Sequence, residues 1–192
     1  MTNISAHQSN LMTSPFGPLS ASAAVEAYIA AGVPPQNIYI GVTLFATGFA
    51  GTNGLGQPAT GPSPDGSWLP GRADYKSLPV AGAVETWDDT AQAGYSYDPN
   101  RKVLNTYDVP QAVLAKCKFV QEKGLGGVII WESMISWRKG INKTGSGDAP
   151  YSSDRSLLKI IHHTIIANNP HQPGPLSTTL ANVPQANQSS PT

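Results

Sequence analysis

The 192-residue chain has one cysteine, little charge and no long apolar run. Cys117 has no second cysteine to pair with, which excludes an internal disulfide, and its place on the apolar side of an expected helix predicts a small buried residue. No stretch of about eighteen apolar residues is present, so no membrane-spanning helix is predicted. Residues 1–8 lack the basic start and apolar stretch of a secretory signal, so the sequence predicts no signal peptide in this chain.

Charged residues are scarce and balanced. They make up 12% of the chain, about half the usual share, and the formal net charge is zero. Because phosphate binding needs clustered Lys and Arg, this composition argues against a nucleic-acid partner. A neutral polymer such as a polysaccharide is compatible with the balance, as are most other ligands. Paired zinc-ligand spacings, a phosphate-binding loop and a Ser-His-Asp order are also missing, so neither a metal nor a cofactor is predicted.

What the chain does contain is an alternation of helix and strand patterns. Residues 20–31 predict a helix that Ser20 caps. Residues 38–45 are β-branched, aromatic and uncharged, which predicts a buried strand. Residues 108–124 predict a second helix with Asp108 as its cap. The buried stripe of this helix is expected at Val113, Cys117 and Val120.

The second half of the chain repeats the alternation after an irregular middle part. Residues 46–108 are rich in Gly, Pro, Ser, Thr and aromatics, which predicts short strands and tight turns with a hairpin near residues 95–104. Residues 126–131, two glycines followed by Val-Ile-Ile-Trp, predict a strand buried on both faces. A polar loop at residues 133–153 then leads to a last helix. Its buried face is expected at Leu157, Leu158, Ile161 and Ile165.

Several motifs in this order carry a family resemblance. They are found at residues 7–11, 40–42, 66–78, 87–99 and 131–132. Together they resemble the C-terminal part of the family 18 glycoside hydrolases, the chitinase family. The resemblance implies an α/β fold, namely the last two strand/helix repeats of a (β/α)8 TIM barrel with a small inserted α+β subdomain. The expected divisions are a barrel segment at 1–45, the insertion at 46–108, a second barrel segment at 109–167 and a disordered tail at 168–192.

The resemblance also predicts what is missing from the catalytic apparatus. Family members hydrolyse β-1,4-linked N-acetylglucosamine polymers with a glutamic acid that ends an Asp-x-x-Asp-x-Asp-x-Glu pattern, while the substrate's acetamide acts as the nucleophile. None of this chain's glutamates has an aspartate two residues before it, so no catalytic residue and no hydrolysis by the isolated chain are predicted. Thr47 stands where active members often carry an arginine, so a cleft arginine is expected to be lost.

Two tryptophans are the candidate substrate-binding residues. Trp131 ends an expected strand, where a tryptophan most often serves core packing, but the resemblance implies the floor beneath a sugar at the cleavage subsite. Trp68 lies in the turn-rich insertion, where carbohydrate stacking and anchoring of a small core are equally open. The expected ligand is chitin or a chitooligosaccharide.

The sequence leaves three functions open. The chain is the C-terminal portion of a chitinase without its proton donor, a non-catalytic chitin-oligosaccharide-binding protein, or the truncated gene product of an active secreted chitinase. An extracellular location is implied by the resemblance alone. Two barrel strands without neighbours leave unpaired edges, which predicts possible pairing with another chain.

Overall fold

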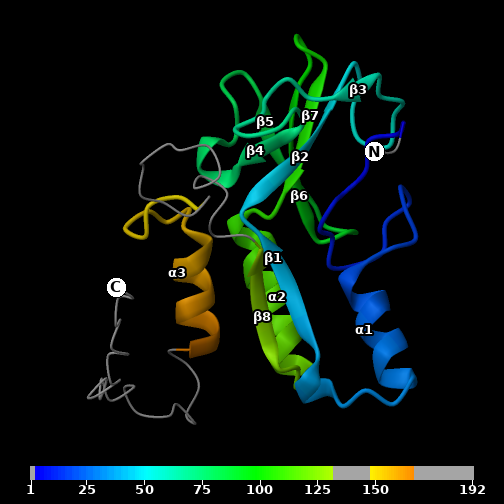
Figure 1. The fold of residues 1–192 in the computed structure, drawn as a ribbon, viewed down its shortest axis with the longest axis vertical. Coiled ribbons are helices and arrows are strands. Elements are labelled where there is room, and N and C mark those ends of the chain that lie inside the picture. The colour runs from blue at the N-terminus through cyan, green and yellow to red at the C-terminus, as the bar shows by residue number, and fades with distance from the viewer. Residues whose placement is uncertain (1–2, 132–147, 167–192) are drawn as a thin grey trace, which may run out of the picture.

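The computed structural model describes residues 3–131 and 148–166, which form two sheets flanked by helices (Figure 1). One is a parallel pair of β1 (Tyr39–Thr43) and β8 (Gly127–Trp131); the other, called the insertion sheet below, has six strands in the order β3-β2-β7-β6-β5, with β4 paired to β2. Its strands are β2 (Phe45–Ala50), β3 (Gly61–Pro62), β4 (Arg72–Asp74), β5 (Val84–Asp88), β6 (Ala93–Asp98) and β7 (Val103–Tyr107). The helices are α1 (Ala21–Ala30), α2 (Pro110–Glu122), α3 (Leu157–Ile161), the 3-10 helices Pro35–Asn37 and Tyr75–Ser77, and the π-helix His162–Ile166.

The first predicted helix is confirmed as α1. The Ser20 hydroxyl accepts a hydrogen bond from the Ala23 backbone N–H, which satisfies one of the donors that a helix leaves unpaired at its start. The helix ends before Gly32, whose φ of +88° is accessible to glycine at little cost. α1 leads through a short connection into β1, so a helix-strand unit forms as the pattern indicates.

The parallel pair has a covered face and an open one. Ile40 and Val42 of β1 are buried, as is the predicted stripe of α2 formed by Val113, Cys117 and Val120. Val42 shares one buried cluster with α2 and with α3, so both helices cover this face of the pair. Burial raises the pKa of the Cys117 thiol to about 11, which fits an inert packing residue.

The opposite face corrects the prediction that residues 126–131 form a strand buried on both faces. Ile129 is 52% exposed and Trp131 is 59% exposed. Tyr39, on the same face of the neighbouring strand, is 52% exposed. Apolar β-branched residues predict a strand, but its burial depends on the layers that neighbouring segments supply. Within the described residues, nothing covers this face of β8.

The expected strand at residues 38–45 is split between the two sheets. β1 ends at Thr43, and Phe45 begins β2. Leu44 joins them: its N–H donates to the Trp131 carbonyl at 3.0 Å, and its own carbonyl accepts from the Tyr75 N–H at 3.0 Å. Because the Leu44 N–H bonds to β8 and its carbonyl bonds to Tyr75, which directly follows β4, the chain changes partner at this residue.

The insertion is almost entirely β structure. The predicted hairpin is confirmed by the antiparallel pairing of β6 and β7, and the Asp98 carboxylate accepts the Asn100 and Arg101 N–H groups in its turn. The expected α+β character is reduced to the 3-10 helix Tyr75–Ser77 within the described part of the insertion. Its residues pair as antiparallel strands because turn-forming residues recur too often for a helix to propagate.

The last helical segment buries Leu157 and Ile161, while Leu158 and Ile165 are half-buried. Ser156 is its N-cap, and Asp148 accepts hydrogen bonds from the Leu157 and Leu158 N–H groups of its first turn. Most of the polar loop expected at 133–153, Glu132 and the tail expected at 168–192 lie outside the described residues. None of the described helices has the length and apolar character needed to cross a membrane.

Candidate functional site

The carboxyl end of the parallel pair holds the first candidate residue, Trp131. It is the last residue of β8 and lies opposite Thr43, the last residue of β1. The Leu44 N–H fixes the Trp131 backbone, while the Trp131 side chain is 59% exposed. The structure therefore places this tryptophan with its backbone anchored and its ring available for contact.

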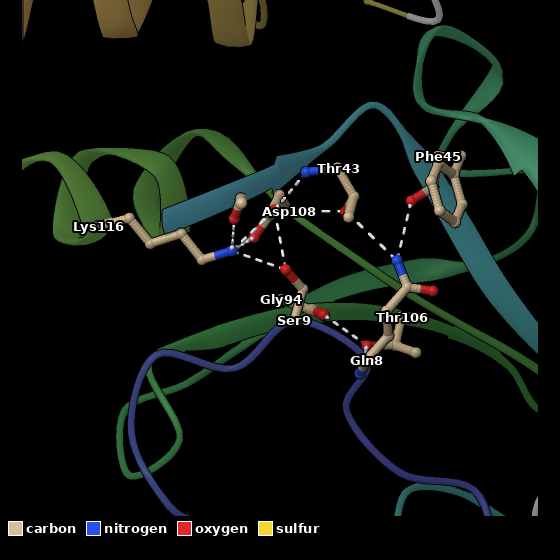
Figure 2. A network of polar contacts seen from close by, with 9 residues as sticks. Gln8, Ser9, Thr43, Phe45, Gly94, Thr106, Asp108 and Lys116 are labelled. Carbon is tan, nitrogen blue, oxygen red and sulfur yellow. Dashed lines mark hydrogen bonds and ion pairs between the residues drawn. The ribbon is translucent and has the colours of Figure 1, made fainter. Parts of the chain in front are cut away.

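A buried ion pair holds the adjoining end of β1 in place. Lys116 and Asp108 are almost fully buried, with Nζ to Oδ1 and Oδ2 distances of 2.8 and 2.9 Å (Figure 2). Lys116 Nζ also donates to Ser9 Oγ at 2.6 Å and to the Gly41 carbonyl at 3.1 Å. Asp108 Oδ2 accepts from the Thr43 N–H at 2.9 Å. The pair thus ties the N-terminal segment, β1 and α2 together.

This pair also corrects the prediction that Asp108 caps the second helix. The N-cap of α2 is Val109, which has no capping side chain, and Pro110 follows it. The Asp108 carboxylate binds Lys116 instead because an ammonium in this buried position requires a counter-charge. Lys116 lies three residues after Val113, on the apolar stripe of α2. A lysine at such a position indicates a buried counter-charge nearby, but the predicted stripe did not include it.

The ion pair occupies the edge of β1 that faces away from β8. The Leu44 N–H and the Ile38 carbonyl bond toward the β8 side, so the alternate residues Gly41 and Thr43 direct their backbone groups to the other edge. Lys116 takes the Gly41 carbonyl and Asp108 takes the Thr43 N–H. These contacts satisfy polar groups on which strand pairing with another chain would depend.

Gln8 connects this network to the start of the insertion sheet. Its amide Nε2 donates to Thr43 Oγ1 at 3.3 Å and to the Phe45 carbonyl at 3.4 Å (Figure 2). Its Oε1 accepts from Arg72 Nη1 at 3.1 Å. Gln8 belongs to the quoted motif at residues 7–11, but only the folded chain shows that it bridges the two sheets.

The second candidate, Trp68, lies against Phe45. The two rings meet edge to face, with centroids 6.0 Å apart and an interplanar angle of 80°. Trp68 is half-buried, and its indole Nε1 is a buried donor without a protein acceptor. The ring thus packs on Phe45 and also keeps part of its surface exposed.

Arg72 lies beside Thr47, the position where the resemblance implies that an arginine is lost. In the β2–β4 pairing Arg72 lies opposite Thr47, and its Nη1 donates to Thr47 Oγ1. The guanidinium also lies 5.3 Å from the centroid of the Phe45 ring. A guanidinium therefore occupies the neighbourhood of Thr47, but it comes from β4 rather than from β2. No local pattern around Thr47 could have indicated this.

A cavity of about 1060 Å³ adjoins this group of residues. Its wall includes Gln8, Gly41, Thr47 and Arg72, and it extends past Tyr39 toward α1. Lys116 is also among its lining residues. Trp131 is not among the residues that line the cavity, but Thr43 connects the two, because it pairs with Trp131 and its Oγ1 accepts a hydrogen bond from the cavity-lining Gln8. Together they form the candidate site.

The best-enclosed glutamate of the described chain, Glu85, is engaged in structure. Burial alone would raise the pKa of its carboxyl, but hydrogen bonds from Arg155 and Tyr107 and the charge of Arg155 outweigh burial and hold the pKa below its usual value. A general acid needs the opposite shift. Glu85 therefore suits an ion pair and not proton donation.

Asp88 is held in a comparable way. Its carboxylate lies 3.0 Å from His7 Nε2 and accepts the Thr90 and Ala91 N–H groups. Burial opposes ionisation, but these hydrogen bonds and His7 together lower the Asp88 pKa. The described residues contain no group of three or more His, Cys, Asp or Glu side chains arranged to hold a metal ion.

Comparison with known proteins identifies the class. Residues 1–134 match the glycosyl hydrolases family 18, and the chain belongs to this family. Among its relatives, Chitinase 1 of Aphanocladium album is 40% identical over 143 residues, covering 72% of this chain and 33% of that protein. Endochitinase 1 of Metarhizium robertsii is 41% identical over 136 residues, covering 69% and 32%. The chain thus spans about a third of the length of these relatives.

Solved structures agree with this assignment. The chitinase of Cycas revoluta in complex with (GlcNAc)3 superposes with a TM-score of 0.65 and 28% identity, covering 85% of this chain and 42% of that one. Chitinase ChiW of a Paenibacillus strain superposes with a TM-score of 0.68 at 22% identity and supports the fold alone. The fold is therefore α/β and related to the TIM barrel of this family.

Proposed function

We propose that this chain forms the last two strand/helix repeats of a family 18 barrel and binds β-1,4-linked N-acetylglucosamine polymers. The observation that carries the proposal is Trp131, a ring anchored through its backbone and 59% exposed at the carboxyl end of a barrel-type strand. Active sites of such barrels lie at this end of the strands, and apolar sugar faces stack on aromatic rings. The divisions at 1–45, 46–108, 109–167 and 168–192 stay predictions.

Trp68 is proposed as a second sugar contact. It lies in a bend between β3 and β4 and packs against Phe45, which follows Thr43 by two residues, and Thr43 pairs with Trp131. An oligosaccharide has several rings, so two aromatic contacts on neighbouring elements suit it better than one. An extracellular location stays a prediction, as does pairing with another chain.

The isolated chain is proposed to be non-hydrolytic. It lacks the Asp-x-x-Asp-x-Asp-x-Glu pattern, and Glu85 and Asp88 have lowered pKa values. Loss of a general acid costs on the order of 10²–10⁴-fold in rate, so a fluorogenic chitotrioside should release no fluorophore above background. Turnover that Glu132→Gln abolishes would contradict this expectation.

Binding is tested by retention on chitin beads and by titration with chitotetraose. Trp131→Ala is expected to weaken binding by about tenfold or more, and Trp68→Ala by a smaller factor, because an anchoring aromatic carries a large share of binding energy. Tyr151→Ala is the matched control, since Tyr151 is 53% exposed and its ring lies against His162. Equal retention of all variants on chitin beads would contradict the proposed site.

A non-catalytic chitin-oligosaccharide-binding protein is the second candidate function. It is favoured by the same pairing of an exposed Trp131 with the missing proton-donor pattern. Saturable binding of chitotetraose without turnover supports this function. Turnover that appears when the upstream part of a family 18 barrel is supplied as a second chain supports the catalytic one.

A further inference from the structure

Arg72 differs from the other arginines that the structure describes. Arg101 pairs with Asp65, and Arg155 pairs with Glu85 at 2.9 Å. Arg72 has neutral partners, the Gln8 amide oxygen and the Thr47 hydroxyl. Among the described residues no carboxylate oxygen lies within 4.0 Å of its guanidinium nitrogens. Within the described part of the chain, its charge is thus without a direct counter-ion.

The orientation of this guanidinium is fixed by its neighbours. Nη1 donates to Gln8 and Thr47, and the group lies over the Phe45 ring at 5.3 Å from the centroid. Gln8 is itself held, because its amide donates to Thr43 and to the Phe45 carbonyl. A group held in this way loses little freedom when a ligand binds.

Part of the guanidinium is still unused. An arginine has five N–H donors, and only those on Nη1 have described protein acceptors. Neither Nε nor Nη2 is among the buried atoms without a partner, so both reach solvent. Arg72 is half-buried and lines the cavity of about 1060 Å³ with Gln8 and Thr47. Its free donors are therefore available to a ligand.

The surroundings decide which ligand chemistry suits these donors. Asp74, two residues along β4, is paired with Lys76 through Oδ2 at 3.7 Å, and its Oδ1 has no hydrogen-bond partner but is buried, so this oxygen is closed to a ligand. An oxygen of a hydroxyl or an acetamide can accept from Nε or Nη2. A protonated amine has no acceptor to offer and is repelled by the like charge.

Resting on the proposed binding of chitooligosaccharides, we propose that Arg72 is a specificity-determining residue that makes the site select N-acetylated sugars over free-amine sugars. Nε and Nη2 donate to an acetamide or hydroxyl oxygen, and the positive charge disfavours a glucosammonium unit. Between two like charges separated by several ångströms at a wet surface, the discrimination is about three- to tenfold per ammonium.

The test measures two dissociation constants and their ratio. Chitotetraose and its fully deacetylated counterpart are titrated by calorimetry at about pH 5.5, below the pKa of an ordinary amine. In Arg72→Gln, which is neutral, the preference for chitotetraose is expected to fall by at least threefold. Arg72→Lys keeps the positive charge but loses the planar guanidinium and its fixed N–H donors. It should therefore keep the preference for chitotetraose over the deacetylated oligomer and bind chitotetraose more weakly. Arg101→Gln is the control and should change neither.

The outcomes separate this inference from the proposed function. A parent chain that binds neither oligomer contradicts the proposed function and the inference with it. A parent chain that prefers chitotetraose, with the same preference in Arg72→Gln, contradicts only the role of Arg72. If circular dichroism shows that Arg72→Gln does not fold, Arg72→Lys decides instead: an unchanged affinity for chitotetraose in that variant contradicts the role of Arg72. If the parent chain binds a uronate-containing tetrasaccharide more tightly than chitotetraose, and Arg72→Gln loses this binding, the site is an anion site and the inference is overturned.

Discussion

β8 in the parallel pair is more apolar than β7 in the insertion sheet, yet its residues are less buried. β7 reads Val-Leu-Asn-Thr-Tyr, and all five of its residues are buried. β8 reads Gly-Val-Ile-Ile-Trp, and none of its residues is fully buried. β7 has β2 on one edge and β6 on the other, whereas β8 pairs with β1 within the described residues. Burial therefore follows the number of neighbours that the fold supplies and not the apolarity of the strand.

The origin of those neighbours explains the contrast. β6 joins β7 as an antiparallel pair through a short turn, and the other neighbour of β7, β2, is farther away in sequence but within the same chain. A parallel pair needs long crossover connections, and every further neighbour of β1 or β8 must come from a distant part of the domain. The insertion sheet is thus complete within this chain, while the parallel pair depends on α2, α3 and the Lys116–Asp108 pair.

The largest expected effect tests whether the two regions are stable independently. Asp108 follows β7 and binds Lys116, Ser9 and Thr43, so it links the insertion sheet to the parallel pair. Asp108→Ala leaves a buried ammonium without a counter-charge and should cost about 3–5 kcal/mol in the free energy of unfolding. Urea unfolding followed by circular dichroism measures this loss.

The control for that variant is an exposed ion pair. Lys123 and Glu26 have side chains that are 41% and 55% exposed, so Glu26→Gln should cost no more than about 1 kcal/mol. If Asp108→Ala costs as little as Glu26→Gln, the buried pair does not support the junction. If only the parallel pair loses hydrogen-exchange protection, the insertion sheet is stable by itself.

The next effect compares the two strands directly. Leu104 on β7 is fully buried, and Leu104→Ala should cost about 2–5 kcal/mol because it leaves a cavity. Ile129 on β8 is 52% exposed, and Ile129→Ala should stay within about 0.5 kcal/mol of the parent chain. Thermal and urea unfolding of both variants measure the difference. A large cost for Ile129→Ala would mean that the open face of β8 is covered in solution.

The same contrast shows which features the sequence could predict. The Ser20 cap, the end of α1 near Gly32 and the β6–β7 hairpin depend on residues close together in the chain, and the local patterns identified them. The split of residues 38–45 at Leu44 was missed because it depends on Trp131 and Tyr75, which are far away in sequence. A continuous apolar run carries no sign of a change of sheet.

The candidate site follows the same rule. Trp131 and Trp68 could be named from motifs, but the bridge made by Gln8 and the approach of Arg72 to Thr47 require the β2–β4 register. Of the residues that the sequence analysis missed, Lys116 could have been identified, because a lysine on an apolar helix stripe requires a buried counter-charge. A pairing with Asp108, eight residues earlier, was within reach of the sequence.

The smallest effect concerns the link between β5 and the segment before α3. Arg155 holds Glu85 through two hydrogen bonds, of 3.0 and 2.9 Å, and Tyr107 adds a third. The folded-state pKa of Glu85 is lowered from its ordinary value of 4.5, so its stabilising contribution is present above pH 4.5 and is lost as the pH falls through the lowered pKa. Since both side chains are partly exposed, the contribution should be about 1 kcal/mol.

Glu85→Gln isolates this contribution. The free energy of unfolding of the parent chain minus that of the variant is expected to be positive at pH 7 and to shrink as the pH falls below 4.5. The Asp88 contribution also falls in acid but is common to both proteins and cancels in the difference. A difference that stays constant between pH 7 and pH 3 would mean that Glu85 has an ordinary pKa and that Arg155 does not couple the insertion sheet to the last helical segment.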